Sequence, residues 1–298
     1  MNAVRKILAL PGVLLFVFAI AAAPVVFQMS RNGPDSGSIE FRWSSMWVQI
    51  RNYFHGIGTG DSFAFYTGLS EYAFWTHIGS YFQVSFLYIS AGALIGTTIG
   101  ILFGIGFAAS RSEWWKRIVE ITGVLPDFII ILLLQFAIVE IAKRTGIVVF
   151  KVANVSSGEE PAVVLPLLSM IIIPSLYMIR NVALQMRLSL TEDYIASAKA
   201  RGLGKAYILF FHALPNVLPF VKADLHKFMG LMIGNLFIVE YFYNMYGITK
   251  LLFSDAFGAQ GYQYDLVVNG ILTLLVLYAL LYAIMRLYLY GWKKAVAR

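Results

Sequence analysis

The sequence contains no cysteine, which excludes a disulfide framework, thiolate metal sites and a cysteine nucleophile. Charge is also scarce, because only 13% of the residues are charged, against about 25% in an ordinary soluble domain. Hydrophobic residues make up 59% of the 298 positions instead. A chain with so little charge cannot cover a surface that faces water, so the composition indicates a membrane protein.

Signatures of catalysis and nucleotide binding are missing as well. There is no G-x-x-x-x-G-K-[ST] loop to cradle phosphates, so the chain is not expected to hydrolyse ATP alone. No G-x-S-x-G elbow is present either. The four histidines form no i, i+4 pair, so no metal or cofactor is expected. The net charge of +7 is attributed to basic residues at membrane edges, and no nucleic-acid partner is expected.

Long apolar runs are what the sequence does contain. A spanning helix needs about 20 mostly apolar residues. The segments that fit are 7–27, 84–109, 118–142, 162–179, 217–243 and 266–285. The first could also be a cleaved signal peptide, but its apolar run exceeds the core of about 7–15 residues that is usual there, which favours an uncleaved helix. We therefore predict an all-α membrane protein with six transmembrane helices.

Lysine and arginine set the predicted orientation. With the N-terminus in the cytoplasm, the inner segments hold 16 of the 23 basic residues and the outer segments hold 7. This bias predicts that both termini are cytoplasmic. The predicted segments are a first transmembrane helix at 1–29, an extracytoplasmic segment at 30–78 and a five-helix core at 79–298.

Two patterns within these segments each allow two interpretations. In the outer segment an apolar helical stripe is formed by Trp43, Trp47, Ile50 and Phe54. It fits a helix that lies on the outer leaflet, or one that packs against the protein's own helices, and glycines 56, 58 and 60 are expected to break it. In the second span, glycines 92, 96, 100 and 104 form one face, which suits close helix packing or a solute path.

The segment 189–216 lies on the predicted inner side and contains strong helix signals. Thr191 is a plausible N-cap and Gly202 a good residue after a helix end, which predicts a short helix over 192–201. A second helix should begin near Gly204 and stop before Pro215, with an apolar stripe at 207, 210, 211 and 214. Two short helices joined at an elbow could fit a groove on a soluble partner, or could pack beneath the membrane.

The spacing of this segment resembles the coupling loop of binding-protein-dependent ABC importer permeases, and within them the oligopeptide, dipeptide and nickel branch. That branch reads Glu-x-Tyr, then Ala-x-Ala-x-Gly-Leu, then His-x-x-x-Asn. The matching residues here are Glu192, Tyr194, Ala198, Ala200, Gly202, Leu203, His212 and Asn216. Ala196 and His212 depart from the Glu and Ile of the wider superfamily pattern. Residues 125–128 and 234–247 also resemble the branch, whereas the C-terminus lacks its Asp-Pro-Arg ending.

The resemblance implies a type I ABC importer permease fold and the permease subunit of an ATP-driven importer, with peptides as the expected substrates. It implies a multi-pass protein of a bacterial or archaeal cell membrane. The implied partners are ABC ATPase subunits, a second permease subunit, an extracytoplasmic substrate-binding protein and the lipid bilayer. The residues expected to couple to the ATPase are Glu192, Tyr194, Ala198, Lys199, Ala200, Arg201, Gly202, Leu203, Gly204, His212, Pro215 and Asn216.

Polar residues inside the predicted spans supply the expected translocation pathway: Asp127, Gln135, Asn235 and Glu240. A carboxylate at the centre of a span costs about 2.5–3.5 kcal/mol, so it is usually functional. We expect Asp127 to face the pathway or a helix partner, and Glu240 to lie near the outer end of its helix, within reach of water. Asp127 and Glu240 also allow an alternative, an ion-coupled secondary transporter or a membrane-embedded enzyme, although such transporters usually contain internal repeats and none is evident.

Overall fold

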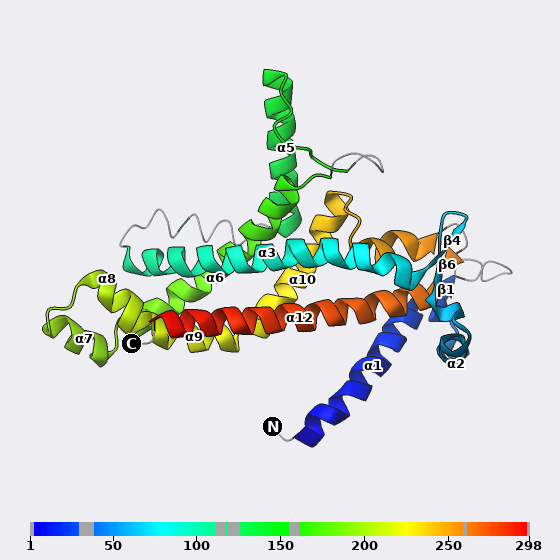
Figure 1. Ribbon diagram of the computed structural model, residues 1–298, viewed down its shortest axis with the longest axis horizontal. Helices are drawn as coiled ribbons and strands as arrows, with labels where there is room; N and C mark the ends of the chain where they lie inside the picture. Colours follow the sequence, from blue (N-terminus) through cyan, green and yellow to red (C-terminus); the bar gives the residue numbers. More distant parts are fainter. Residues whose placement is uncertain are drawn as a thin grey trace. The chain divides into compact units, whose positions relative to one another are not determined.

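The computed structural model describes residues 3–29, 39–110, 117, 126–154, 161–258 and 261–296. It is predominantly helical (Figure 1). The α-helices are α1 Ala3–Val26, α2 Trp43–Thr59, α3 Phe74–Ala109, α5 Asp127–Thr145, α6 Val164–Ser189, α7 Asp193–Ala200, α8 Lys205–Tyr207, α9 Leu214–Ala223, α10 Leu225–Phe242, α11 Ile248–Lys250 and α12 Tyr264–Val296. A 3-10 turn, η1, covers Asp61–Phe63, and two π-helical segments cover η2 Ile208–Ala213 and η3 Leu251–Asp255.

The described strands form three antiparallel pairs, each of two short strands. They are β1 Phe27–Met29 with β2 Ile39–Phe41, β3 Ala64–Thr67 with β4 Ser70–Ala73, and β5 Phe257–Gly258 with β6 Gly261–Tyr262. In register, Phe27 lies opposite Phe41 and Phe257 opposite Tyr262. Strands this short do not build a sheet layer, so the all-α class holds for the described chain.

The chain divides into two compact units. Unit 1 comprises Met1–Gln83 and Tyr246–Val276, and unit 2 comprises Val84–Met245 and Leu277–Arg298. The helices α3 and α12 each contribute residues to both units.

Within the described residues, four helical stretches are long and apolar enough to cross a membrane, and they confirm a multi-pass membrane protein. They are Phe74–Ala109, Val164–Ser189, Lys205–Ala223 and Tyr264–Val296, and a shorter apolar stretch covers Pro11–Val26. The predicted spans at 84–109 and 266–285 fall within α3 and α12, and the predicted span at 162–179 begins two residues before α6. Residues 118–125 of the predicted third span lie outside the described residues. The count of six spans therefore stays a prediction.

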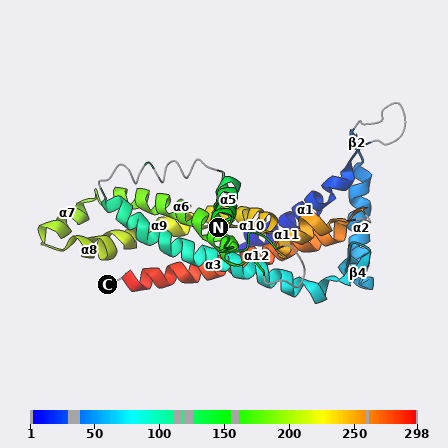
Figure 2. The same ribbon diagram turned by 90° about the horizontal axis from the view of Figure 1, so that it is seen from above.

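The predicted fifth span, 217–243, is not one uninterrupted helix. It is built from α9 and α10, which meet at Asp224. The interruption lies beside charged positions, Lys222 and Lys227, which a continuous apolar helix would not contain. In unit 2, α5 runs at a steep angle to α3 and is seen nearly end-on in the second view (Figures 1 and 2). Ile131 is its only fully buried residue, so most of the apolar surface of α5 faces outwards.

Unit 1 is centred on α1, α2 and the first turns of α12. The Tyr53 hydroxyl donates to Asn269 Oδ1 (2.7 Å), and Asn269 Nδ2 donates to the Ser62 carbonyl (2.7 Å). Burial, helped by the nearby Asp265 carboxylate, raises the pKa of Tyr53 to about 12, so this phenol stays a donor at neutral pH. The hydrogen bonds tie α2 and η1 to α12.

The predicted helix of the outer segment is confirmed as α2, but most of its predicted apolar stripe is more than half exposed. Trp43 and Trp47 are each 63% exposed and Phe54 is 57% exposed. The packed side instead holds Tyr53 and Gly56. Ile50 packs against the core of unit 1, and the centroid of the Phe54 ring lies 5.3 Å from that of the Phe18 ring in α1, so part of the stripe packs against the protein's own helices while the two tryptophans are exposed. The helix also passes two glycines before it ends at Gly60 (φ +94°), so the prediction that all three break it is wrong.

The glycine face of α3 packs directly against α6 in unit 2. The α6 residues opposite glycines 92, 96, 100 and 104 are, in order, Met170, Pro174, Met178 and Val182. A Cβ added at Gly92 would lie 2.5 Å from the Met170 carbonyl oxygen, and one added at Gly100 would overlap Met178 Cβ. The interpretation as helix packing is confirmed, because no space for a solute remains at these positions.

Candidate functional site

The predicted helix of the 189–216 segment is confirmed as α7, one residue shorter at each end. Its N-cap is Glu192, not Thr191, and no side chain bonds the free N–H groups. The helix α6 extends to Ser189, with Leu190 as its C-cap. The Thr191 hydroxyl donates back to the Leu188 carbonyl (2.8 Å), so this side chain stabilises the end of α6 and does not cap α7. Asp193 lies in the first turn of α7, where the helix dipole favours an acid.

The end of α7 is a complete Schellman turn around Gly202. Gly202 has φ +77°, a conformation that glycine adopts at little cost. Its N–H donates to the Lys199 carbonyl (2.9 Å), and the Leu203 N–H donates to the Ala198 carbonyl (3.3 Å). These two bonds satisfy carbonyls that would otherwise be free, so the elbow has a defined geometry.

The second helix begins where predicted, with Gly204 as the N-cap of α8. It does not stop before Pro215, and that prediction is wrong. The chain continues through the π-helical segment η2 into α9, and Pro215 lies in the first turn of α9. In the π-helical segment the backbone hydrogen bonds run from residue i to i−5, not to i−4. A proline in the first turn of a helix has no N–H that would need an acceptor. The chain can therefore stay helical across Pro215.

The predicted apolar stripe of this helix is only partly buried. Leu214 is fully buried, but Tyr207 is 38% exposed. The residues that the structure buries in this stretch are Ile208, Leu209, Ala213 and Leu214. The π segment changes the number of residues per turn, and this rotates the packed face away from the 3.6-residue pattern.

The predicted coupling residues divide into an inner and an outer set. Ala198 is completely buried, and the Tyr194 hydroxyl shares a 2.5 Å hydrogen bond with Ser189 Oγ. Asn216 Nδ2 donates to the His212 carbonyl (2.9 Å) and stabilises the helix beyond the elbow. The outer, exposed set consists of Glu192, Tyr194, Lys199, Ala200, Arg201, Gly202, Gly204 and Asn216. Nothing lies within 4 Å of a Cβ built at Gly202 or Gly204, so the outer side of the elbow is open.

The four predicted pathway residues do not gather around one cavity. Gln135 Nε2 donates to the carbonyls of Val152 and Phe242 (both 3.1 Å) and ties α5 to the end of α10. Asn235 is completely buried and donates to the Ser169 carbonyl (3.3 Å). Both amides therefore hold helices together in unit 2. Asp127 is half-buried at the first turn of α5.

Glu240 lies near the end of α10, as predicted, but water does not reach it. It is 1% exposed, and Ser85 Oγ donates to its carboxyl oxygen at 2.5 Å. The expectation of water access is wrong because α3 covers this position, and helix packing of that kind is not encoded in the local sequence.

The structure contains a polar cleft that the sequence analysis did not predict. It lies in unit 2 and has a volume of 630 Å³, with a lining that includes Tyr177, Arg180, Asn181, Phe220, Asp224 and Lys227. The sequence did contain a signal for this cleft, namely the charged residues Asp224 and Lys227 beside an apolar run. Charged residues next to spanning helices usually face a cavity or a partner.

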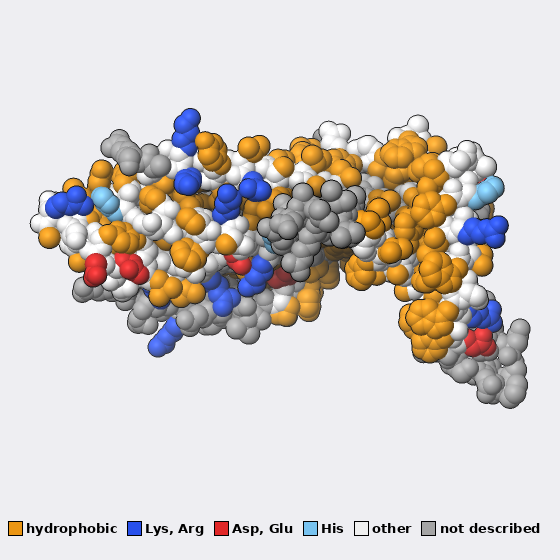
Figure 3. Space-filling view, turned by 90° about the horizontal axis from the view of Figure 1, so that it is seen from below, with side chains coloured by type: hydrophobic (Ala, Val, Ile, Leu, Met, Phe, Trp, Pro, Cys, Tyr) orange, Lys and Arg blue, Asp and Glu red, His pale blue; other side chains and the backbone are white. Residues whose placement is uncertain are grey.

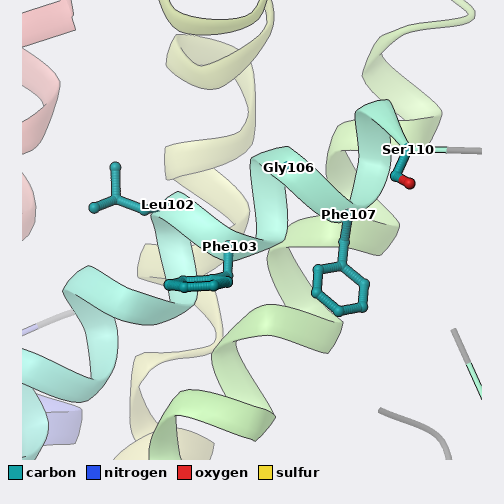
Figure 4. A pocket seen from close by; sticks show the side chains of 5 residues that line it. All are labelled: Leu102, Phe103, Gly106, Phe107 and Ser110. Carbon is teal, nitrogen blue, oxygen red and sulfur yellow. The ribbon is translucent and has the colours of Figure 1, made fainter. Parts of the chain in front are cut away.

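A second cavity, of 340 Å³, is lined within the described chain by residues at the end of α3 and just after it: Leu102, Phe103, Gly106, Phe107 and Ser110 (Figure 4). Only Ser110 offers a polar side chain, so this cavity has few groups that could orient a solute. In the part of the chain that is described, no three His, Asp or Glu residues cluster as metal ligands would.

Comparison with known proteins shows which family this chain matches. Residues 96–294 match the family described as binding-protein-dependent transport system inner membrane component. The chain is 29% identical over 210 residues to the oligopeptide transport system permease protein OppB of Salmonella typhimurium, which covers 67% of this chain and 63% of that protein. It is 23% identical over 211 residues to the nickel import system permease protein NikB of Staphylococcus aureus, which covers 69% of this chain and 59% of that protein. The chain thus spans less than two thirds of the length of either relative. These matches confirm the resemblance to the oligopeptide and nickel branch.

Proposed function

The chain belongs to the family of binding-protein-dependent transport system inner membrane components, and from this premise we propose that it is the permease subunit of an ATP-driven importer. It forms half of a translocation pathway, and a separate ATPase chain supplies the energy. The chain itself is a transport component and not an enzyme. Both termini lie in the cytoplasm, and the protein has six spans in a bacterial or archaeal cell membrane.

The coupling role is proposed from the open elbow between α7 and α8. Short helices with a hydrogen-bonded turn between them move as one body, which a lever between two proteins requires. Exposed Lys199 and Arg201 lie on either side of Ala200 in this elbow. A groove on an ATPase subunit could therefore contact the elbow without any displacement of the permease's own side chains.

Peptides are the proposed substrates, because the oligopeptide permease is the more similar of the two relatives described above. The proposed partners are two ABC ATPase subunits, a second permease that is either a different chain or a second copy, and an extracytoplasmic substrate-binding protein. The bilayer surrounds the apolar helices.

Co-purification tests this proposal directly. The tagged chain is extracted from its native membrane in mild detergent and its bound subunits are identified by mass spectrometry. We expect an ATPase chain in the complex, with ATP hydrolysis stimulated by the loaded binding protein. Purification of the chain without any ATPase, together with uptake driven by an ion gradient alone, would support the secondary-transporter alternative instead.

The predicted topology is tested with single cysteines, since the chain has none. Ser197 lies on the exposed side of α7, and Ser70 is exposed in β4. In intact cells an impermeant thiol reagent should label Ser70→Cys and spare Ser197→Cys, and both should react after the membrane is opened. Labelling of Ser197→Cys in sealed cells would reverse the proposed orientation.

Asp127 is proposed to contribute to the pathway, and Asp127→Asn should reduce uptake several-fold while the amount of protein in the membrane changes little. The reason is that a half-buried carboxylate next to a span is costly unless it is used. Glu140→Gln on the same helix is the matched control, because Glu140 is paired with Arg144 (2.9 Å) in an exposed i, i+4 ion pair. Equal uptake by both variants would assign Asp127 only a helix-dipole role.

A further inference from the structure

The cleft between α6 and the α9–α10 junction contains two basic side chains and one acidic side chain, from Arg180, Lys227 and Asp224. On the face drawn in Figure 3, basic side chains lie among apolar side chains. The volume of 630 Å³ is within the range of about 300–1,000 Å³ that is usual for small-molecule sites.

The acidic residue of the cleft already has partners. The Tyr177 hydroxyl donates to Asp224 Oδ2, and Asn181 Nδ2 donates to the same oxygen at 2.7 Å. These bonds hold the carboxylate against the α6 wall. Asp224 therefore serves to fix the junction of α9 and α10, and its charge is partly used within the protein.

Among the described residues, neither basic side chain of the cleft forms an ion pair. Where the structure is described, the ion pairs are Arg42–Glu40 and Arg144–Glu140, and neither Arg180 nor Lys227 takes part in one. Lys227 Nζ lies 5.6 Å from the centroid of the Tyr177 ring, which orients the ammonium group without cancelling its charge. The cleft as a whole thus has an excess of positive charge.

The extent of the cleft along α6 allows two sources of an anion. Along α6 the lining runs from Tyr177, near the middle of Val164–Ser189, to Gln185, one turn from the end. At a rise of about 1.5 Å per residue this is roughly 12 Å of helix. The predicted span ends at residue 179, so the lining begins within the span and continues beyond its predicted inner end, where a lipid phosphate or a passing solute could bind.

We propose that this cleft binds a carboxylate of the transported solute, with Arg180 and Lys227 as the recognising cations. A guanidinium can bind a carboxylate through two parallel hydrogen bonds, and the ammonium adds a second point charge. Tyr177 and Phe220 provide apolar walls beside them. The inference rests on the proposed transport function and specifies that the pathway favours solutes with a free acid group.

The absence of cysteine makes the cleft's charge measurable with one reporter, Ala223→Cys, because Ala223 lines the cleft and is exposed. The full chain is placed in phosphatidylcholine nanodiscs with the subunits that co-purify. Its labelling rates are compared for methanethiosulfonate ethylsulfonate, an anion, and methanethiosulfonate ethyltrimethylammonium, a cation. A Leu287→Cys reporter, 71% exposed on α12 and outside the cleft lining, is the reference.

The anionic reagent should be preferred about tenfold more at position 223 than at position 287, since a charged cleft raises local counter-ion concentration by at least that factor. Arg180→Gln and Lys227→Gln should each lower this preference at least threefold. Arg187→Gln, an exposed charge of the same helix that does not line the cleft, should leave it unchanged. Equal preferences at 223 and 287 would overturn the proposal.

Protection experiments identify the source of the carboxylate. Trialanine with a free C-terminus should slow anionic labelling at 223, and trialanine amide should not. Protection by phosphatidylglycerol in the nanodisc without protection by trialanine would assign the cations to a lipid phosphate, and protection by neither would show that no carboxylate binds; both results overturn the proposal. None of these readouts needs ATPase activity, so a failure of coupling would be distinguishable from a failure of this site.

Discussion

Replacing Gly202 with valine should abolish uptake and reduce ligand-stimulated ATP hydrolysis to the unstimulated rate, while the helical domain stays in the membrane. Gly202 has φ +77°, where a β-branched residue is a strong outlier. Forcing valine into that conformation costs on the order of 1–3 kcal/mol. The cheaper response is for the turn to adopt another backbone conformation, which would break the Schellman bonds and loosen the elbow.

The space around Gly202 makes this experiment specific for backbone conformation. A Cβ at this position meets nothing within 4 Å in the described chain, so valine causes no clash inside the permease. Gly202→Asn should keep most of the coupling, because asparagine tolerates positive φ. Gly291→Val is the matched control outside the elbow, since Gly291 has no positive φ and equally open space.

The measurement is ATPase stimulation and solute uptake in a reconstituted complex, with assembly checked by co-purification. If the valine variant assembles and couples normally, the elbow does not transmit the ATPase movement and the proposed mechanism fails. If asparagine is as damaging as valine, the residue is needed for its size at a contact with another protein, and not only for its φ.

Adding a single methyl group at Gly100 should destabilise the membrane domain. The new Cβ would overlap Met178 Cβ and lie 3.2 Å from Met178 Cα, so α3 and α6 must move apart. Overpacking of this kind costs about 1–3 kcal/mol, and a loss of interhelical contact is added to it. Gly92→Ala should be at least as severe, because its nearest neighbour is a backbone carbonyl oxygen that cannot rotate away.

The test is the midpoint of thermal unfolding of the detergent-solubilised chain, followed by size-exclusion chromatography. Gly106→Ala is the control on the same helix, because nothing lies within 4 Å of a Cβ there. Gly100→Ala should unfold several degrees below wild type, and Gly106→Ala at or above it, since alanine favours helix by up to about 1 kcal/mol over glycine. Equal midpoints for the two variants would contradict the close approach of α3 and α6.

Several features followed from the sequence because they depend on local chemistry. Low charge and long apolar runs were sufficient to predict a multi-pass helical membrane protein, since both are required of helices that are surrounded by lipid. The end of α7 at Gly202 and the start of α8 after Gly204 were predicted from residue types that favour particular φ, ψ and capping bonds. The four-residue spacing of glycines in α3 indicated a packing face, because that spacing brings side chains onto one side of any helix.

Other features required residues far apart in the chain. The burial of Glu240 depends on Ser85, and the position of Asp224 depends on Tyr177 and Asn181 of another helix. The path of the chain past Pro215 depends on a π-helical turn that no local preference predicts. The sequence by itself thus determined the membrane class, the family and the elbow between α7 and α8, which follow from the surrounding lipid, residue type and spacing. Only the tertiary structure decided which polar groups are buried, which α2 face is exposed and where the basic cleft lies, because these depend on which helices pack together.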